Sequence, residues 1–315
     1  MTTSHWTEKT ARDLLTAEEL VQVTRKSNLQ GWSVILFDWM IIVGIFCVAA
    51  VYPNPFTLIA AVVLLGGRQL ALGIVVHETG HRTLFQSQAL NDFCGKWLSG
   101  YWVFSDKESY MKGHLKHHQN AGTAQDPDLP NYSAYPVSRE SLRRKIKRDL
   151  TGQIGWRRIK SIGRSIRRIR TIQPRLRQTL IRSLLVNLAM LITMTLFGHP
   201  WLYLLWVIAF MTSHMLVTRI RQIAEHAAVP DNTSLDIRRN TRTIHISRLE
   251  RLLIAPHRVN YHIEHHLMPS VPIYHLHLLH DLLLRKGYYD GIEFSRGYYN
   301  LLKQVTYPAA QGTVS

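Results

Sequence analysis

Apolar residues in this chain gather into four long runs instead of being spread along it as in a soluble core. The runs cover residues 32–51, 56–76, 180–197 and 201–217. Each has about the 20 residues that an α-helix needs to cross the hydrocarbon core of a membrane. The turns within each pair, 52–55 and 198–200, are short and contain proline or glycine, which punctuate helices. The pattern therefore predicts four transmembrane helices in two hairpins.

The alternative, four buried helices of a soluble protein, agrees less well with the composition. The mean hydropathy of the chain is near zero only because very basic segments separate the apolar runs. Between residues 139 and 179, apolar residues recur about once per helical turn, and Lys and Arg fill the positions between them. This pattern is typical of amphipathic helices that lie in the headgroup plane on anionic lipid. A nucleic-acid surface would also be basic, but this segment lies between two membrane hairpins, so we expect no nucleic acid partner.

The distribution of charge predicts the orientation of the chain. Neither hairpin turn carries Lys or Arg, whereas the other segments carry nearly all 38 of these residues. By the positive-inside rule, both termini and the central loop are cytoplasmic. Residues 1–30 contain four carboxylates and no apolar stretch typical of a signal peptide, so we expect a cytoplasmic or surface-lying segment. We expect a membrane domain over 31–290 and a C-terminal tail over 291–315.

Two ionisable residues interrupt the first hairpin. Asp38 and Arg68 lie at almost equal distances from the turn on its two helices. A lone charge inside a membrane is costly, so we predict that they pair, with Arg68 facing a substrate cavity as the alternative. The two cysteines, Cys47 and Cys94, support neither a disulfide framework nor a cysteine metal site.

Three histidine boxes follow or flank the apolar runs. They are His77 and His81, then His114, His117 and His118, then His262, His265 and His266. Helical residues three and four apart share a face, so we expect each box to point its imidazoles one way. His226, after the fourth run, is a ninth candidate, and Gln222 lies one turn before it. All of them fall on the predicted cytoplasmic side. Imidazole binds iron, zinc, copper and nickel, and this number of ligands is enough for two metal ions.

Other interpretations of these residues remain open at this point. His77-Glu78-Thr79-Gly80-His81 matches the zinc protease signature, with Glu78 as general base, but that mechanism leaves the other boxes without a purpose. A metal transporter or sensor should carry ligands deep within the spans. Asp126 and Asp128 could hold ligand imidazoles, or only form the turn around Pro127. Glu225 and Glu264 are weaker candidates for that role. The remaining histidines lack box spacing or lie among surface residues: His5, His199, His245, His257, His275, His277 and His280. His214 lies within the fourth run, where we expect it to contact a neighbouring helix, with a place in a cavity wall as the alternative.

Together the boxes resemble those of the integral-membrane fatty acid desaturase and hydroxylase superfamily, over residues 30–290. His77 with His81 resembles the first box, His114 with His117 and His118 the second, and the triplet at 262–266 the third. His226 resembles an additional ligand that follows the last span in acyl desaturases, and Gln222 takes the place of a water-linked Asn. The stretch from Asn260 to Pro269 resembles bacterial acyl desaturases most closely, and Asn260 is a further candidate for a position behind the ligands.

The resemblance implies an all-α polytopic membrane oxidoreductase whose cytoplasmic, histidine-rich cap holds a non-haem di-iron centre. It further implies O2 as co-substrate, a fatty acyl lipid or acyl thioester as substrate, and a location in the bacterial inner membrane. The chain has no His-Pro-Gly-Gly haem motif, so the two electrons would come from a separate, ferredoxin-like donor. Hydroxylases, carotenoid ketolases and desaturases of small substrates share the same boxes, and the sequence does not separate them.

Overall fold

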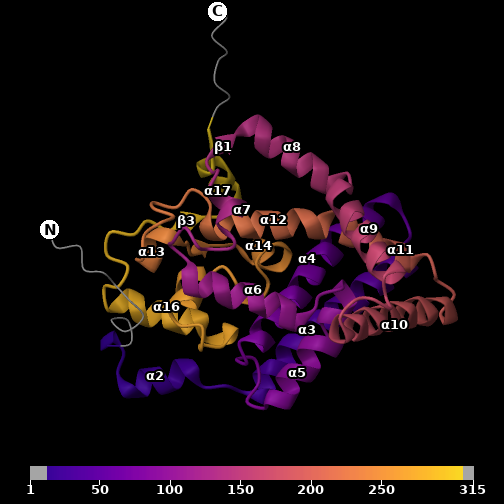
Figure 1. The fold of residues 1–315 in the computed structure, drawn as a ribbon, viewed down its shortest axis with the longest axis horizontal. Coiled ribbons are helices and arrows are strands. Elements are labelled where there is room, and N and C mark those ends of the chain that lie inside the picture. Colours follow the sequence, from indigo (N-terminus) through magenta and orange to yellow (C-terminus); the bar gives the residue numbers. More distant parts are fainter. Residues whose placement is uncertain (1–12, 308–315) are drawn as a thin grey trace, which may run out of the picture.

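The computed structural model describes residues 13–307, and these form a mostly helical molecule (Figure 1). The α-helices are α2 (Ala17–Thr24), α3 (Asn28–Val51), α4 (Pro55–Gly80), α5 (Gln88–Trp97), α6 (Lys107–Asn120), α7 (Leu129–Tyr132), α8 (Arg139–Leu150), α9 (Gln153–Arg167), α10 (Pro174–Leu196), α11 (Leu202–Met211), α12 (Ser213–His226), α13 (Ile237–Asn240), α14 (Arg248–Leu253), α15 (His262–Leu267), α16 (Leu276–Arg285) and α17 (Tyr298–Gln304). Short 3-10 helices are η1 (Gly100–Val103), η2 (Pro256–Arg258) and η3 (Ile273–His275). The predicted segment 1–30 and tail 291–315 extend beyond the described residues, and His5 lies outside them.

Four helical segments are long and apolar enough to cross a membrane, as predicted. They are Ala17–Val51, Pro55–Gly80, Pro174–Leu196 and Leu202–His226. Polar residues extend these helices beyond the apolar runs. The helices α3 and α10 begin before their runs, whereas α4 and α12 end after theirs. The C-terminal extension of α4 matters most, since it carries the first histidine box.

The helix α4 is the centre of the fold. It packs against α3, α5, α11 and α12, and 67% of its most apolar window is buried. Asn54 and Thr57 form a capping box at its start, with Pro55 in the first turn, where a missing N–H costs nothing. In α3 and α10 only 28% of the corresponding window is buried. Their apolar side chains therefore face outwards, as expected for helices surrounded by lipid.

The fourth apolar run is not one regular helix. The backbone breaks at Thr212, between α11 and α12, where φ is −121° and ψ is −86°. Ser213 donates its hydroxyl hydrogen bond to the carbonyl of Val62 at 2.6 Å. A Cβ at Gly66 would lie 2.2 Å from the Ser213 hydroxyl, so only glycine permits this close approach of α4 and α12. The break gives α12, which carries His226, a direction of its own.

The predicted pairing of Asp38 and Arg68 is confirmed, with Arg68 Nη1 2.9 Å from Asp38 Oδ1 and both side chains buried. The pair has further partners that the sequence did not indicate. His257 Nε2 lies 2.7 Å from the other oxygen of Asp38, and Arg68 also donates to the carbonyl of Leu252. These contacts tie α3 and α4 to the segment that precedes the third histidine box.

Two small parallel sheets join the C-terminal segment to earlier parts of the chain. Strand β1 (Val137–Ser138) pairs with β4 (Thr306–Tyr307), and β2 (Ile244–His245) pairs with β3 (Ser295–Arg296). Residues of α17 join the main hydrophobic core, so the described part of the predicted tail packs as part of the fold. The basic segment 139–179 is helical as expected, forming α8, α9 and the start of α10 along one side of the molecule (Figure 1).

Candidate metal centre

Four helices bring the nine predicted histidines together. The end of α4 carries His77 and His81, α6 carries the second box, α12 ends at His226, and α15 carries the third box. They form a five-histidine group, made of His77, His81, His114, His118 and His265. They also form a four-histidine group, made of His117, His226, His262 and His266. Within each group, one ring nitrogen of every residue lies within 4.8 Å of those of the others.

The second and third boxes each divide between the two groups. His114 and His118 enter the five-histidine group while His117 enters the other one. In the third box the assignment is reversed, and His265 alone enters the five-histidine group. The expectation that each box points one way is therefore only half correct. In both boxes the two residues four apart lie almost in line on the helix and enter the same group. The residue three positions after the first is rotated the other way and enters the other group.

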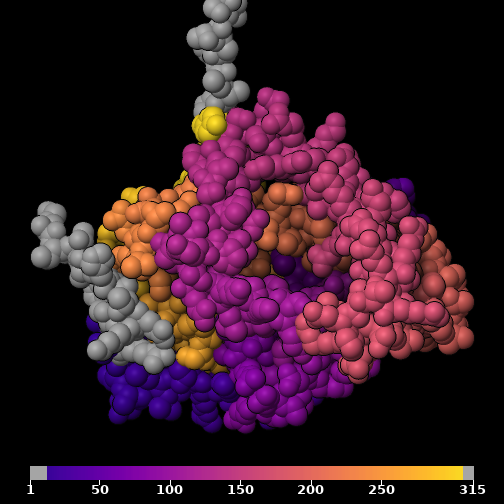
Figure 2. All heavy atoms as spheres, viewed as in Figure 1, coloured from indigo at the N-terminus to yellow at the C-terminus, as the bar shows by residue number. Residues whose placement is uncertain are grey.

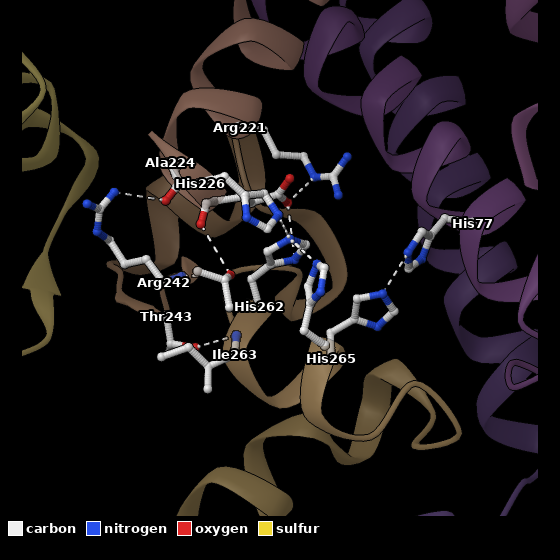
Figure 3. A network of polar contacts seen from close by, with 12 residues as sticks. His77, Arg221, Ala224, His226, Arg242, Thr243, His262, Ile263 and His265 are labelled. Atoms are coloured by element: carbon white, nitrogen blue, oxygen red, sulfur yellow. Dashed lines mark hydrogen bonds and ion pairs between the residues drawn. The ribbon is translucent and has the colours of Figure 1, made fainter. Parts of the chain in front are cut away.

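The ring nitrogens approach one another closely. In the four-histidine group the Nε2 atoms form a closed ring of contacts, at 3.1 Å (His117–His226), 3.0 Å (His226–His262), 3.1 Å (His262–His266) and 3.3 Å (His266–His117). In the five-histidine group the successive distances are 3.0 Å (His77–His265), 3.0 Å (His265–His118), 2.9 Å (His118–His114) and 3.0 Å (His114–His81). Figure 3 shows part of this arrangement, with His77 facing His265.

These contacts are not ordinary hydrogen bonds. His117 uses Nδ1 to donate to the carboxylate of Asp126 at 2.8 Å, and His226 uses Nδ1 to donate to the carbonyl of Asn240 at 3.0 Å. A neutral imidazole has one proton, so Nε2 of both rings presents a lone pair. Two lone pairs 3.1 Å apart repel each other unless a cation lies between them. The four-histidine group therefore has the donor chemistry of a metal site.

Burial keeps the imidazoles in the form that binds metal. Together with repulsion from neighbouring imidazoles, burial holds the pKa of His114, His262, His265 and His266 well below its usual value. The same causes lower the pKa of His118 to about 2. Metal ligation requires the neutral ring, so these groups need no deprotonation at neutral pH.

Two nitrogens that share one metal ion at about 2.0–2.1 Å would lie about 3 Å apart, and the successive pairs here agree with that spacing. A tetrahedral zinc site has four ligands, and a catalytic zinc site has three from the protein. A group of five histidines exceeds both. The five-histidine group would therefore fit a metal ion of higher coordination number, and the four-histidine group supplies one ligand more than a catalytic zinc site takes from the protein.

The predicted residues behind the ligands have different outcomes. Asp126 accepts hydrogen bonds from His117 and Tyr132, which fixes the His117 ring. The Asp128 carboxylate stays 3.9 Å from His117 Nδ1, beyond hydrogen-bond distance. Within residues 13–307, neither Gln222 nor Asn260 makes a hydrogen bond to an imidazole. Gln222 lines a cavity beside the site, and Asn260 instead donates to the carbonyl of Ile244 at 2.8 Å.

Glu78 holds the first box in place, a role that the sequence did not predict. One of its oxygens accepts from His77 Nδ1 at 2.9 Å, and the other accepts from the Ile273 N–H at 3.1 Å and the Thr83 hydroxyl at 3.0 Å. It thereby connects α4 to the segment after the third box. Because His77, Thr83 and Ile273 occupy both oxygens, Glu78 is not placed as the general base of a zinc protease. Its position next to His77 was the only indication available in the sequence.

The two other glutamates considered at the sequence level also have partners. Glu225 lies 2.7 Å from Arg221 Nε and 3.6 Å from His262 Nδ1, so its charge faces a ligand candidate. Glu264 accepts from His280 at 2.5 Å and from Thr243, and it anchors α15 without contacting an imidazole of either group. No described histidine outside the nine joins either group.

Two cavities differ in position and lining. A cavity of 280 Å³ lies beside the histidines, between α6, α7, α12 and α15. A larger, almost wholly apolar cavity of 630 Å³ lies between α3 and α10, and contacts none of the nine histidines.

The fold and site define a mostly helical protein with four candidate membrane helices and two histidine groups that could hold metal ions. The fatty acid desaturase model matches residues 53–298, and the chain belongs to that family. It is similar to a dihydrorhizobitoxine desaturase of Bradyrhizobium elkanii, 24% identical over 293 residues, covering 87% of this chain and 80% of the relative. It is also similar to a β-carotene ketolase of Paracoccus sp. (strain N81106 / MBIC 01143), 27% identical over 232 residues, covering 71% of this chain and 79% of the relative. The chain is thus an oxidoreductase of this superfamily.

Proposed function

We propose that this protein is an O2-dependent desaturase that introduces a double bond into a fatty acyl chain. The nine histidines bind two iron ions, one in each group, and a separate donor supplies two electrons. The observation that carries the proposal is the convergence of nine imidazoles into two groups with nitrogen separations near 3 Å. Iron supplies the oxidising power to remove hydrogen from a methylene group, which no side chain can provide.

The residues around the ligands have the task of holding this site rigid. Asp126, Glu78 and the carbonyl of Asn240 each accept a hydrogen bond from the outer nitrogen of a ligand ring. Such partners fix the tautomer and the orientation of the ring, and they raise its basicity. The burial of both groups keeps bulk water from the site, which protects a strong oxidant from side reactions.

The proposed arrangement in the membrane follows from charge and exposure. The two hairpins span the bilayer, and both termini, the central loop and the histidine-rich cap lie on the cytoplasmic side of the inner membrane, with a membrane domain over about 31–290. The outward-facing apolar side chains of α3 and α10 support this arrangement. The basic helices α8 and α9 lie on anionic headgroups, and the basic face also attracts an acidic, ferredoxin-like donor.

A second candidate is another oxidation by the same superfamily: hydroxylation, carotenoid ketolation or desaturation of a small substrate. Two observations favour keeping it. The relatives carry the names of a dihydrorhizobitoxine desaturase and a β-carotene ketolase. The cavity beside the histidines is also lined largely by polar side chains, which is unusual for a site that receives a hydrocarbon chain.

The test is expression in a host that lacks unsaturated lipids, followed by lipid mass spectrometry and measurement of iron per purified chain. We expect a new unsaturated species and two iron ions with the wild type. The variant His265→Ala should lose the product and part of the iron. The matched control His277→Ala removes an imidazole outside both groups and should retain both. An oxygenated lipid would favour a hydroxylase, an unchanged lipid profile would favour a small substrate or a carotenoid, and absence of iron would refute the proposal.

A further inference from the structure

The cavity beside the histidines contains charge where a hydrocarbon substrate would require apolar walls. His117, His226 and His262 of the four-histidine group form part of its lining, and Arg221 and Glu225 of α12 form another part. Figure 2 shows the surface hollowed between α6 and α9, and part of α12 is visible inside the hollow. A methylene chain in this cavity would cover charged and polar groups without offering them hydrogen bonds, which is costly.

Arg221 presents a guanidinium in this cavity, next to the carboxylates of Glu225 and Asp128. Its Nε lies 2.7 Å from Glu225 Oε1, which fixes the guanidinium. Its two terminal nitrogens turn away from that carboxylate (Figure 3). Arginine stays charged at all relevant pH values, and the two terminal nitrogens match the two oxygens of a carboxylate. The side chain is only 12% exposed, so an anion bound there would be largely shielded from water.

Tyr110 of α6 adds a hydroxyl close to the guanidinium of Arg221. Its ring stacks on His114 with 5.5 Å between centroids, and the residue lines the same cavity. The cavity thus offers a carboxylate a charged fork from α12 and a hydroxyl from α6, next to ligand candidates of both groups.

We propose that the substrate binds as a free carboxylate held by Arg221 and Tyr110, and that oxidation takes place within a few carbons of that carboxylate. The oxidation part of this inference rests on the di-iron chemistry of the proposed function, and a compact acid would correspond to its second candidate, a small substrate. Carboxylate binding depends on neither. A free fatty acid and a compact acid, such as an amino acid, share this chemistry. The volume of 280 Å³ lies at the lower end of ligand pockets, which favours the compact acid.

Binding to the iron-loaded protein in detergent micelles tests the proposal by calorimetry. The probes are hexanoate, 2-aminohexanoate and hexadecanoate, each compared with its methyl ester. We expect the acids to bind and the esters to bind at least tenfold more weakly. Arg221→Gln should weaken binding of the acids about ten- to hundredfold, as expected for loss of a charged hydrogen bond. The control Arg157→Gln removes an equal charge from α9 outside the cavity and should bind as the wild type does.

The single variant leaves Glu225 buried without its partner, so a double variant is needed. Arg221→Gln/Glu225→Gln removes both charges, and iron content reports whether the metal site remains intact. Loss of carboxylate binding with iron retained supports the proposal. Wild-type binding by this variant, or equal binding of acids and esters, would overturn it. If wild-type protein binds the acids but no iron, the proposed function fails and the carboxylate site stands. Preference for hexadecanoate over 2-aminohexanoate would assign the carboxylate to a fatty acid.

Discussion

Replacement of Glu78 tests the connection between the first histidine box and the rest of the site. The side chain is 2% exposed and accepts hydrogen bonds from His77, Thr83 and Ile273. Glu78→Ala would leave the Nδ1–H of His77 and the N–H of Ile273 buried without acceptors. The Thr83 hydroxyl keeps its second acceptor, the carbonyl of Glu78.

The magnitude follows from the two orphaned donors. Each buried unsatisfied donor costs about 1–3 kcal/mol, so Glu78→Ala should lower the free energy of unfolding by about 2–6 kcal/mol. Glu78→Gln keeps an acceptor for one donor only and should lose about half as much. Because His77 also loses the partner that orients its ring, metal affinity of the five-histidine group should fall about 10–100-fold.

Thermal unfolding in micelles and iron content per chain measure the two effects. Glu140→Gln is a matched control, since that carboxylate pairs with Arg144 on the exposed face of α8 and should contribute almost nothing. Glu78→Ala should retain more iron than His77→Ala, which removes a ligand outright. The reasoning is refuted if Glu78→Ala unfolds at the wild-type temperature and retains full iron.

Three further predictions concern charge and metal. Asp38→Asn should lower the free energy of unfolding by about 3–5 kcal/mol, because it leaves the buried charge of Arg68 without a carboxylate; an unchanged unfolding temperature would contradict this. Acid should destabilise the fold, because the unfolded chain protonates its histidines near pH 6.5 whereas His118 resists protonation down to about pH 2; urea unfolding at stepwise lower pH below 6.5 should show steadily falling stability. A strong iron chelator should lower the unfolding temperature of the wild type, since metal binds only the folded site; equal temperatures with and without chelator would argue against bound metal.

Local patterns account for what could be predicted from the sequence. The four apolar runs specify the long helices because about 20 consecutive apolar residues have few other stable arrangements. The spacing of the boxes identified eight of the nine histidines that converge, and its place after the fourth apolar run identified His226. The pairing of Asp38 with Arg68 was also predictable, because both helices could be counted from one turn.

Contacts between distant segments were not available from such patterns. His257 contacts Asp38 although 219 residues separate them in the sequence. Glu78 accepts a hydrogen bond from the N–H of Ile273, which is 195 residues further along the chain. Arg221 follows an apolar run like any other basic residue that ends a span, so nothing in its neighbourhood marks it as part of a cavity.

The sequence by itself determined the long helices, their length and apolar character, and which histidines are candidate metal ligands. Each of these depends on neighbours within a few helical turns. The tertiary structure alone decided that His117 and His118 enter different groups, and that Arg221 faces the same cavity as His226. Successive residues on a helix diverge by about 100°, so their partners depend on which helices pack on each side. That packing is set by the whole core, which no short stretch of sequence encodes.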